Sequence, residues 1–435
     1  MTQNLGWILF IIFSGFSAFR RKWGLYLLFL ILPFYALLIT FSQHFFHTSG
    51  EILFSLRLIK EGILLGILVS LIYSWIRNRS LIKEKINFYL SDIFILIYLI
   101  ILISSGLIFH SSLAEIFFGL RYDFFFFFSY FIFRLYFIFS KDNEFQTIIK
   151  IIFTTAIIVF IFALLQFFVL PKDFLIQFGY SKTVSSIFDT TAPLAAYQLL
   201  GNSNLLRVQS SFAGPNQLAS FALVIIFLAW GIIFSKKPSI LAWISLVLAI
   251  LVLILTFSRS AWIGFVAGMI ILASFNLKKR PIFSGLIFGS LLILAILGFL
   301  LFRNQINDII IRPTSSVWHA VALKDSWEAF RTHIFGLGLG KIGPASQWLQ
   351  KPIISENYYL QIGLESGIFG LITFILAFVF LISDLKQKDS VLANSAICLI
   401  FSFLFASFFL HTLADGVLSF YIGLFLAIVQ TKKER

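Results

Sequence analysis

The sequence predicts an all-α integral membrane protein with about twelve transmembrane helices and a large helical loop outside the membrane. Of its 435 residues, 60% are hydrophobic and only 12% are charged, and the mean hydropathy is +0.98. A soluble domain carries about twice that share of charged residues. So much apolar surface needs lipid as its solvent, and the apolar residues fall in runs long enough to cross a bilayer.

The predicted spans follow from these apolar runs in chain order. They lie at residues 23–42, 57–76, 90–109, 119–139, 147–170, 214–234, 238–256, 260–275, 282–302, 357–382, 391–411 and 414–430. Residues 5–19 form a shorter run, which either spans the membrane or lies at its interface. Its basic residues, 20–22, follow the apolar run rather than precede it, so it is not a typical signal peptide.

Basic residues gather in short clusters between the runs and set the predicted orientation. The clusters lie at 20–22, 77–85, 236–237, 278–280, 386–388 and 432–435, all on one side if the twelve runs alternate. The positive-inside rule makes that side the cytoplasm, so the net charge of +14 reflects membrane orientation rather than nucleic-acid binding. Segments 171–213 and 303–356 then face outward. The chain divides into a transmembrane bundle (1–302), a periplasmic loop (303–356) and C-terminal transmembrane helices (357–435).

The second outward segment has a pattern of its own. Pro313, directly after Arg312, is typical of a first helical turn. An apolar stripe at helical spacing then places this helix on the outer membrane surface: Ala320, Leu323, Trp327 and Phe330. Four glycines within 336–343 end the helix and form either a plain tight turn or a turn whose N–H groups approach an anion. A new helix begins near Ser355, the candidate N-cap, and enters the next span.

Orientation does not explain the basic residues on the predicted outer side, namely Arg207, Arg259, Arg303, Arg312, Arg331, Lys341 and Lys351. Arg259 lies in a very short turn between two spans. An arginine beside a membrane must extend to the headgroups or find an anionic partner. Guanidinium groups match phosphate with two parallel hydrogen bonds. The arginines therefore predict a phosphate-bearing lipid ligand, with contact to ordinary headgroups as the alternative.

Charged residues also lie near the outer ends of two earlier spans. Arg57 and Glu61 are four residues apart, which predicts a pair on one helix. Arg121 lies near the outer end of its own span, where it either joins the other outward arginines or contacts headgroups.

Glu356 is the candidate general base, since it begins a helix that enters the membrane near the arginines. The alternative role is stabilisation of the helix dipole. His319 and His333, on the outer segment, are either bases or solvated side chains. The sequence has no CxxC or Cys/His zinc pattern.

These residues together carry a resemblance to a known family. Glu356-Asn357, nine residues and Gly367-Ile-Phe-Gly370 resemble the O-antigen ligase signature, in which a His-Asn pair precedes GxxG at this spacing. Upstream, Phe212-Ala-Gly-Pro-Asn216, Ser258-Arg259-Ser260-Ala-Trp262, and Arg312 and Trp318 followed by the glycines from 336 occur in the family's order. The chain is therefore similar, over about residues 200–372, to the bacterial O-antigen ligase/polymerase family.

The resemblance implies a glycosyltransferase of the bacterial inner membrane with about twelve helices and a large periplasmic loop. Its donor would be a glycan on undecaprenyl pyrophosphate, and its acceptor a hydroxyl of lipid A-core or of a growing polysaccharide, with no nucleotide, metal or other cofactor. The implied catalytic residues are Glu356, Arg259 and Arg312. The implied substrate-binding residues are Arg207, Asn216, Arg121, Trp318, Arg331 and Asn357.

One departure and two alternatives accompany this resemblance. Glu356 stands where the ligases have histidine, so ligase and polymerase both remain open. A transporter is the runner-up and predicts ionisable residues in mid-membrane and broken helices in two related halves. A structural membrane protein would not need arginines gathered on its outer face.

Overall fold

A computed structural model describes residues 5–48, 50–77, 87–140, 142–182, 193–196, 200, 205–235, 239–276, 308–309, 312–348 and 355–431. Their regular structure is helical apart from one isolated bridge between Ser181 and Ala195. The helices are α1 (Leu5–Phe19), α2 (Arg21–Ile31), η1 (Leu32–Phe34), α3 (Tyr35–Phe46), α4 (Gly50–Arg57), α5 (Ile59–Arg77), α7 (Leu90–Ile108), α8 (Leu113–Asp123), α9 (Phe125–Phe139), α10 (Asp142–Phe168), η2 (Phe174–Phe178), α11 (Pro215–Ile233), α12 (Ile240–Leu255), α13 (Arg259–Asn276), α15 (Pro313–Thr332), η5 (Gly343–Trp348), α16 (Tyr358–Lys386), α17 (Val391–Ala406), η6 (Thr412–Ala414) and α18 (Leu418–Thr431).

The chain is a multi-pass membrane protein. Among the described residues, six helical segments are long and apolar enough to cross a bilayer: Arg21–Phe46, Ile59–Arg77, Leu90–Ile108, Glu144–Phe168, Pro215–Ile233 and Tyr358–Lys386. Shorter apolar helices lie at the other expected runs: Gly6–Phe19, Ile240–Leu255, Arg259–Phe275, Val391–Ala406 and Leu418–Thr431. The expected run at 282–302 lies outside the described residues, so the count of about twelve spans stays a prediction.

The expected span at 119–139 is not one continuous helix, because the chain bends near its start. α8 ends at Asp123, α9 begins at Phe125, and the two are bent by 65°; counted as one broken span, they would make a seventh crossing. The buried Asp123 carboxylate accepts a hydrogen bond of 2.9 Å from Gln361 Nε2 of α16. A carboxylate bonded to a neighbouring helix at this point anchors the chain where it changes direction.

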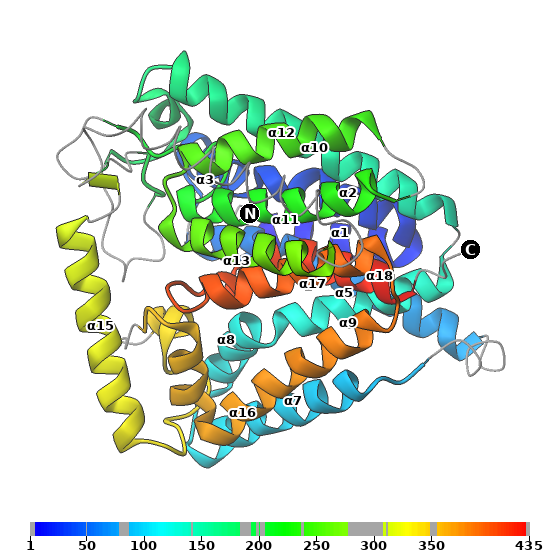
Figure 1. Ribbon diagram of the computed structural model, residues 1–435, viewed down its shortest axis with the longest axis vertical. Coiled ribbons are helices and arrows are strands. Elements are labelled where there is room, and N and C mark those ends of the chain that lie inside the picture. The colour runs from blue at the N-terminus through cyan, green and yellow to red at the C-terminus, as the bar shows by residue number, and fades with distance from the viewer. Residues whose placement is uncertain are drawn as a thin grey trace.

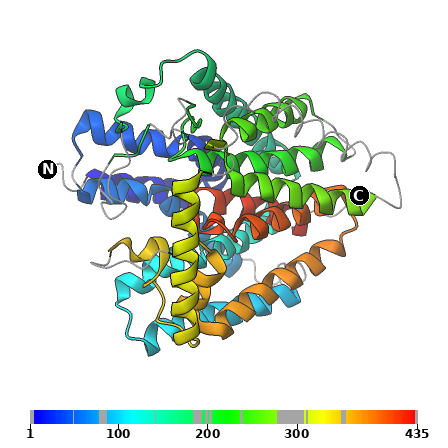
Figure 2. The same cartoon turned by 60° about the vertical axis from the view of Figure 1, so that its left-hand side comes forward.

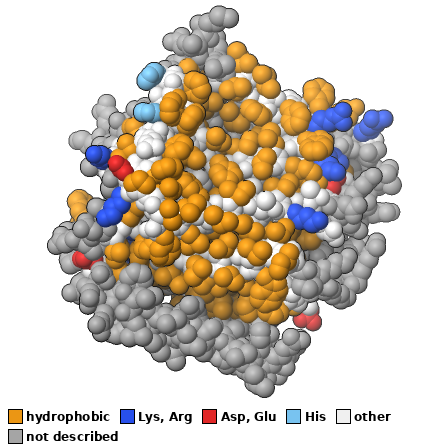
Figure 3. Space-filling model, turned by 90° about the horizontal axis from the view of Figure 1, so that it is seen from above, with side chains coloured by type: hydrophobic (Ala, Val, Ile, Leu, Met, Phe, Trp, Pro, Cys, Tyr) orange, Lys and Arg blue, Asp and Glu red, His pale blue; other side chains and the backbone are white. Residues whose placement is uncertain are grey.

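The bundle helices run roughly side by side, and α15 lies across one end of them (Figure 1). The turned view shows the same crossing, with α15 in yellow at the front (Figure 2). One face of the molecule carries a broad hydrophobic area, with charged side chains gathered towards its two opposite edges (Figure 3). An apolar belt between two charged rims is the surface that a bilayer requires.

Arg21, from the first basic cluster, lies where three helix ends meet. Arg21 Nη1 of α2 donates to Ser74 Oγ near the end of α5 at 2.9 Å, and Arg21 also donates to the Phe139 carbonyl that ends α9. The start of α2 therefore meets the ends of α5 and α9. Which side of the membrane this end faces stays a prediction.

Glycines allow two helix pairs in the bundle to approach closely. Gly62 and Gly66 of α5 face α1, and a Cβ on Gly66 would lie 2.1 Å from the Ser14 carbonyl oxygen. Gly264 and Gly268 of α13 face α17 in the same way, where a Cβ on Gly264 would lie 2.5 Å from the Ser402 carbonyl oxygen. Small residues one helical turn apart are a typical interface between helices in membranes.

We expect Gly66→Ala to destabilise the protein by about 1–3 kcal/mol, because the new methyl group collides with backbone rather than with a movable side chain. The thermal unfolding temperature of the purified protein in detergent measures this effect. Gly15→Ala in α1 is the matched control, since a Cβ there meets nothing within 4 Å. Equal unfolding temperatures for the two variants would contradict the close contact between α1 and α5.

Candidate functional site

The turn between α12 and α13 brings two distant arginines together. Its Phe257 has a left-handed backbone, with φ at +49°. Arg207 Nε donates to the Thr256 carbonyl oxygen at 3.0 Å, and Arg312 Nη2 donates to the Phe257 carbonyl oxygen. Carbonyls at a helix end lack partners inside the helix. The guanidinium groups supply those partners and are held at the turn as a result.

Arg259 adds a third guanidinium at the same place, at the first position of α13. Its Nη1 donates to Ser316 Oγ in the first turn of α15 at 2.8 Å. Arg312 directly precedes α15, so both arginines tie the α12–α13 turn to the start of that helix. We call Arg207, Arg259 and Arg312 the arginine cluster.

The arginine cluster concentrates positive charge in a half-buried setting. Burial lowers the pKa of Arg207 to about 9, and the charges of Arg312 and Arg259 add to the lowering. Burial also lowers the pKa of Arg312 to about 10, with a further contribution from Arg259. Like charges held together away from water are stabilised by a bound anion. The arrangement is therefore suited to a phosphate or pyrophosphate group.

Asn216 connects the arginine cluster to a large cavity. Its Oδ1 accepts hydrogen bonds from Arg207 Nη2 at 2.7 Å and from Ser258 Oγ at 2.9 Å. Pro215 at the first position of α11 places Asn216 in that helix's first turn. Asn216 also lines a cavity of about 650 Å³, whereas the three arginines are not among the described residues that line it. The cluster thus lies just behind this part of the cavity wall.

Glu356 is connected to the arginine cluster through α15. Its Oε2 is 3.4 Å from His319 Nδ1. His319 and Ser316, the partner of Arg259, are three residues apart on α15 and so share one face of it. The charge of His319 also acts on His411, which lines the cavity. Glu356, His319 and the arginine cluster therefore occupy one region at the end of the bundle.

The other predicted site residues do not contact the arginine cluster among the hydrogen bonds and ion pairs of the described residues. Arg121 lines the same cavity as Asn216, but its guanidinium pairs with Glu61. Trp318 is 75% exposed on α15, and Arg331 is exposed at the end of that helix. Asn357 directly follows Glu356 and caps α16, because its Oδ1 accepts from Leu360 N at 3.0 Å, and its predicted role in substrate binding stays a prediction.

Two expectations about local structure need correction. The N-cap of α16 is Asn357 rather than Ser355, whose hydroxyl instead donates to the Asn357 carbonyl oxygen. Arg57 and Glu61 were expected to pair on one helix, but they lie on two, because α4 ends at Arg57 and α5 begins at Ile59. Glu61 forms ion pairs with Lys60 and Arg121.

The outer helix begins as expected, with Arg312 as N-cap and Pro313 in its first turn. Its apolar stripe does not pack as one surface. Phe330 is buried, whereas Leu323 and Trp327 are 44% and 51% exposed. The face turned towards the protein carries Ser326 and His319 instead. Contact of the exposed part of the stripe with the membrane surface stays a prediction.

The glycines after α15 form a tight packed turn. Gly336, Gly338, Gly340 and Gly343 all have positive φ. The N–H groups of Leu337 and Gly338 donate to carbonyls of α16, and Ile342 N donates to Glu365 Oε1 at 3.1 Å. These donors hold the turn against α16, which favours the plain tight turn over an anion site.

Sequence reasoning missed Ser316 and the pairing of His319 with Glu356. The available signal was their spacing, since Arg312, Ser316 and His319 follow one another at helical intervals of four and three residues. Nothing in the local sequence indicated which residues this face of α15 would contact. Arg303 and Lys351 lie outside the described residues.

The fold and the site define a multi-pass membrane protein with three arginines gathered at one end of its helix bundle. Residues 244–375 match the family model described as O-antigen ligase. This range contains the α12–α13 turn, α15 and the residues around Glu356, whereas Arg207 and Asn216 precede it. The match supports membership of the chain in the O-antigen ligase family of lipid-linked glycan ligases and polymerases. No curated protein matches the chain significantly.

We expect His411 to make stability depend on pH in the acidic range. Burial lowers its pKa to about 4, with a contribution from the charge of His319, whereas an unfolded histidine titrates near about 6.5. Between these values the unfolded state binds more protons, so stability falls as the pH falls through this window. His411→Gln should reduce the loss of unfolding temperature between about pH 7 and pH 5. An unchanged pH slope would show that His411 is not held neutral.

Proposed function

We propose that the protein transfers a glycan from undecaprenyl pyrophosphate to a hydroxyl group of a lipid A-core or growing polysaccharide acceptor. The reaction takes place at the periplasmic face of the bacterial inner membrane. The observation that carries the proposal is the gathering of Arg207, Arg259 and Arg312 around one short turn at the end of the bundle. The family match over residues 244–375 supports the same class of reaction.

The arginine cluster supplies what this reaction needs at the leaving group. The bond between the anomeric carbon and the phosphate oxygen breaks, and the anomeric carbon forms a new bond to the acceptor oxygen. Negative charge then develops on the pyrophosphate, which leaves on its lipid carrier. Fixed guanidinium groups at that position stabilise the developing charge without reorganisation.

The acceptor hydroxyl loses its proton to the Glu356–His319 couple. Because His319 Nδ1 faces the Glu356 carboxylate, Nδ1 carries the proton of the neutral ring and Nε2 keeps a free lone pair. Nε2 of His319 then accepts the hydroxyl proton, and the carboxylate stabilises the imidazolium that forms. Glu356 is thus a positioning residue that acts through His319. This role is compatible with a glutamate at the position where the ligases have histidine.

We expect Arg259→Ala and Arg312→Ala each to lower glycan transfer by about 10²–10³-fold, because each removes one charge-stabilising donor. The measurement is surface glycan in cells that produce the variant, together with transfer in vesicles containing the lipid-linked donor. Polymer left on its carrier would identify a ligase, and single-unit glycans a polymerase. Lys324→Ala, on the exposed side of α15, is the control. Normal surface glycan in both arginine variants would refute the role of the cluster.

We expect His319→Ala to lose about 10²–10⁴-fold in transfer rate, with partial recovery on addition of imidazole. Glu356→Gln should lose less, and should add little in the His319→Ala background, because it acts through the same group. If Glu356→Gln keeps full activity, Glu356 has no part in proton transfer and only stabilises the helix dipole. A larger loss for Glu356→Gln than for His319→Ala, without rescue, would make Glu356 the base itself.

A transporter remains the second candidate, and one feature favours it. The two helices α8 and α9 meet at a 65° bend, and the buried carboxyls of Asp123 and Glu365 interact electrostatically close to it. Transporters place ionisable groups at such breaks. Movement of the lipid-linked glycan across vesicles without a new glycosidic bond would favour transport over transfer.

A further inference from the structure

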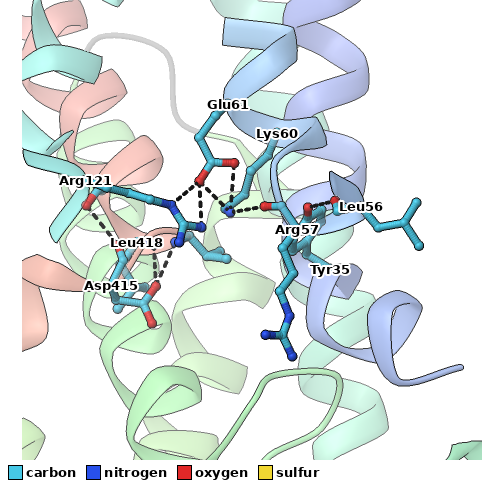
Figure 4. Close-up of polar contacts among 10 residues, drawn as sticks. Tyr35, Leu56, Arg57, Lys60, Glu61, Arg121, Asp415 and Leu418 are labelled. Atoms are coloured by element: carbon cyan, nitrogen blue, oxygen red, sulfur yellow. Dashed lines mark hydrogen bonds and ion pairs between the residues drawn. The ribbon is translucent and has the colours of Figure 1, made fainter. Parts of the chain in front are cut away.

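A second group of cations lines the cavity that Asn216 also lines. Arg57 at the end of α4, Lys60 in the first turn of α5 and Arg121 near the end of α8 all contribute to its wall. Lys60 is only 5% exposed, so a molecule must enter the cavity to approach it. Figure 4 shows Lys60 and Arg121 converging on Glu61, with the Arg57 side chain pointing away from it.

Glu61 holds two of these cations in place from behind the wall. Lys60 Nζ lies 2.9 Å from Glu61 Oε1, and Arg121 donates to the same oxygen through Nε at 3.0 Å and Nη2 at 2.9 Å. Glu61 itself is not among the described residues that line the cavity, whereas both of its partners are. The carboxylate thus lies behind the wall, and the cavity side of the group is cationic.

The charges around this group leave a surplus that is positive. The three cations Arg57, Lys60 and Arg121 outnumber the two carboxylates beside them, Glu61 and Asp415, which gives +3 − 2 = +1. Asp415 Oδ1 is already used, because it accepts from Val417 N at 2.8 Å and Leu418 N at 2.9 Å at the start of α18. Burial lowers the pKa of Arg57, and the charge of Arg121 adds to the lowering. An anion entering the cavity would relieve this surplus.

This cationic group is separate from the arginine cluster. Its members come from α4, α5 and α8, whereas the cluster surrounds the α12–α13 turn and, among the described residues, is bonded to the cavity wall through Asn216 on α11. Tyr35 and Tyr122 also line the cavity, and Lys60 Nζ lies 4.8 Å above the Tyr35 ring. Aromatic faces beside cations are suited to a sugar that carries an anionic substituent.

We propose that Arg57, Lys60 and Arg121 form an acceptor subsite that binds a phosphate or carboxylate group on the glycan receiving the transfer. The proposal rests on the proposed function, in which the arginine cluster holds the pyrophosphate of the donor. A transfer reaction needs its two substrates next to each other, and the arginine cluster is bonded to this same cavity wall through Asn216. The anionic substituent would orient the acceptor so that its hydroxyl lies near His319.

The test uses the full-length protein in detergent, with glucose 6-phosphate as the anionic probe and glucose as its uncharged match. Ligand-observed NMR or calorimetry measures their binding in the presence and absence of saturating undecaprenyl pyrophosphate. The variants are Arg57→Gln and the double variant Lys60→Met/Glu61→Gln, which removes one charge of each sign and so keeps the buried balance. Arg77→Gln, exposed near the opposite end of α5, is the matched control.

We expect glucose 6-phosphate to bind whether or not undecaprenyl pyrophosphate is present, and glucose to bind far more weakly. Each variant should weaken glucose 6-phosphate binding by about tenfold, the loss expected for one charge-assisted contact. Both variants should leave the affinity for undecaprenyl pyrophosphate unchanged, and Arg77→Gln should change neither. Transfer assays should show a raised KM for acceptor with little change in KM for donor.

Several outcomes would overturn the acceptor subsite. They are displacement of glucose 6-phosphate by undecaprenyl pyrophosphate, unchanged probe binding in both variants, or a loss of undecaprenyl pyrophosphate affinity in Arg57→Gln. If phosphatidylglycerol vesicles displace glucose 6-phosphate and phosphatidylcholine vesicles do not, then Arg57, Lys60 and Arg121 bind an anionic lipid headgroup instead of the acceptor. If wild-type protein does not bind undecaprenyl pyrophosphate yet keeps Arg57-dependent probe binding, the proposed function fails while this anion site stands.

Discussion

Two backbone carbonyls at the end of α12 organise the candidate site. The chain turns at Thr256 and Phe257, directly after α12, and Arg207 and Arg312 donate to the carbonyl oxygens of these two residues. Each arginine comes from a segment distant in sequence, so the hydrogen bonds also fix the start of α15 against the bundle. Arg259 reinforces this connection through Ser316. The same contacts that hold the outer helix in place therefore concentrate the positive charge, and the proposed chemistry follows from a structural need of the backbone.

The bundle provides the rigid frame that this arrangement requires. α11 and α18 are almost wholly buried, and glycines at the α1–α5 and α13–α17 contacts let backbones approach closely. Because α13 begins with Arg259 and α11 begins beside Asn216, helix packing sets the positions of both residues. The cavity then lies between helix ends, where polar side chains can meet without crossing the apolar belt. A site at the end of such a bundle is open to a lipid-linked substrate and to a polar one.

Much of the candidate site could be predicted because its residues carry their own physical signal. Arg259 in a short turn and Arg312 before a proline-initiated helix are charges that orientation leaves unexplained. Asn357 and Trp318 were assigned to the site by resemblance alone, whereas the first caps a helix and the second faces outward. The pairing of His319 with Glu356 and that of Arg121 with Glu61 could not be predicted, because each joins helices that are distant in sequence.

By itself, the sequence determined the membrane class, the approximate positions of the long apolar helices and the start of α15, because apolar runs and a proline act over a few neighbouring residues. Only the tertiary structure decided where α8 breaks from α9, which face of α15 turns inward and which charges share a cavity. Those outcomes depend on contacts such as Asp123 with Gln361, between residues that no local pattern connects. The fold class is a property of local composition, whereas the site is a property of how the helices pack.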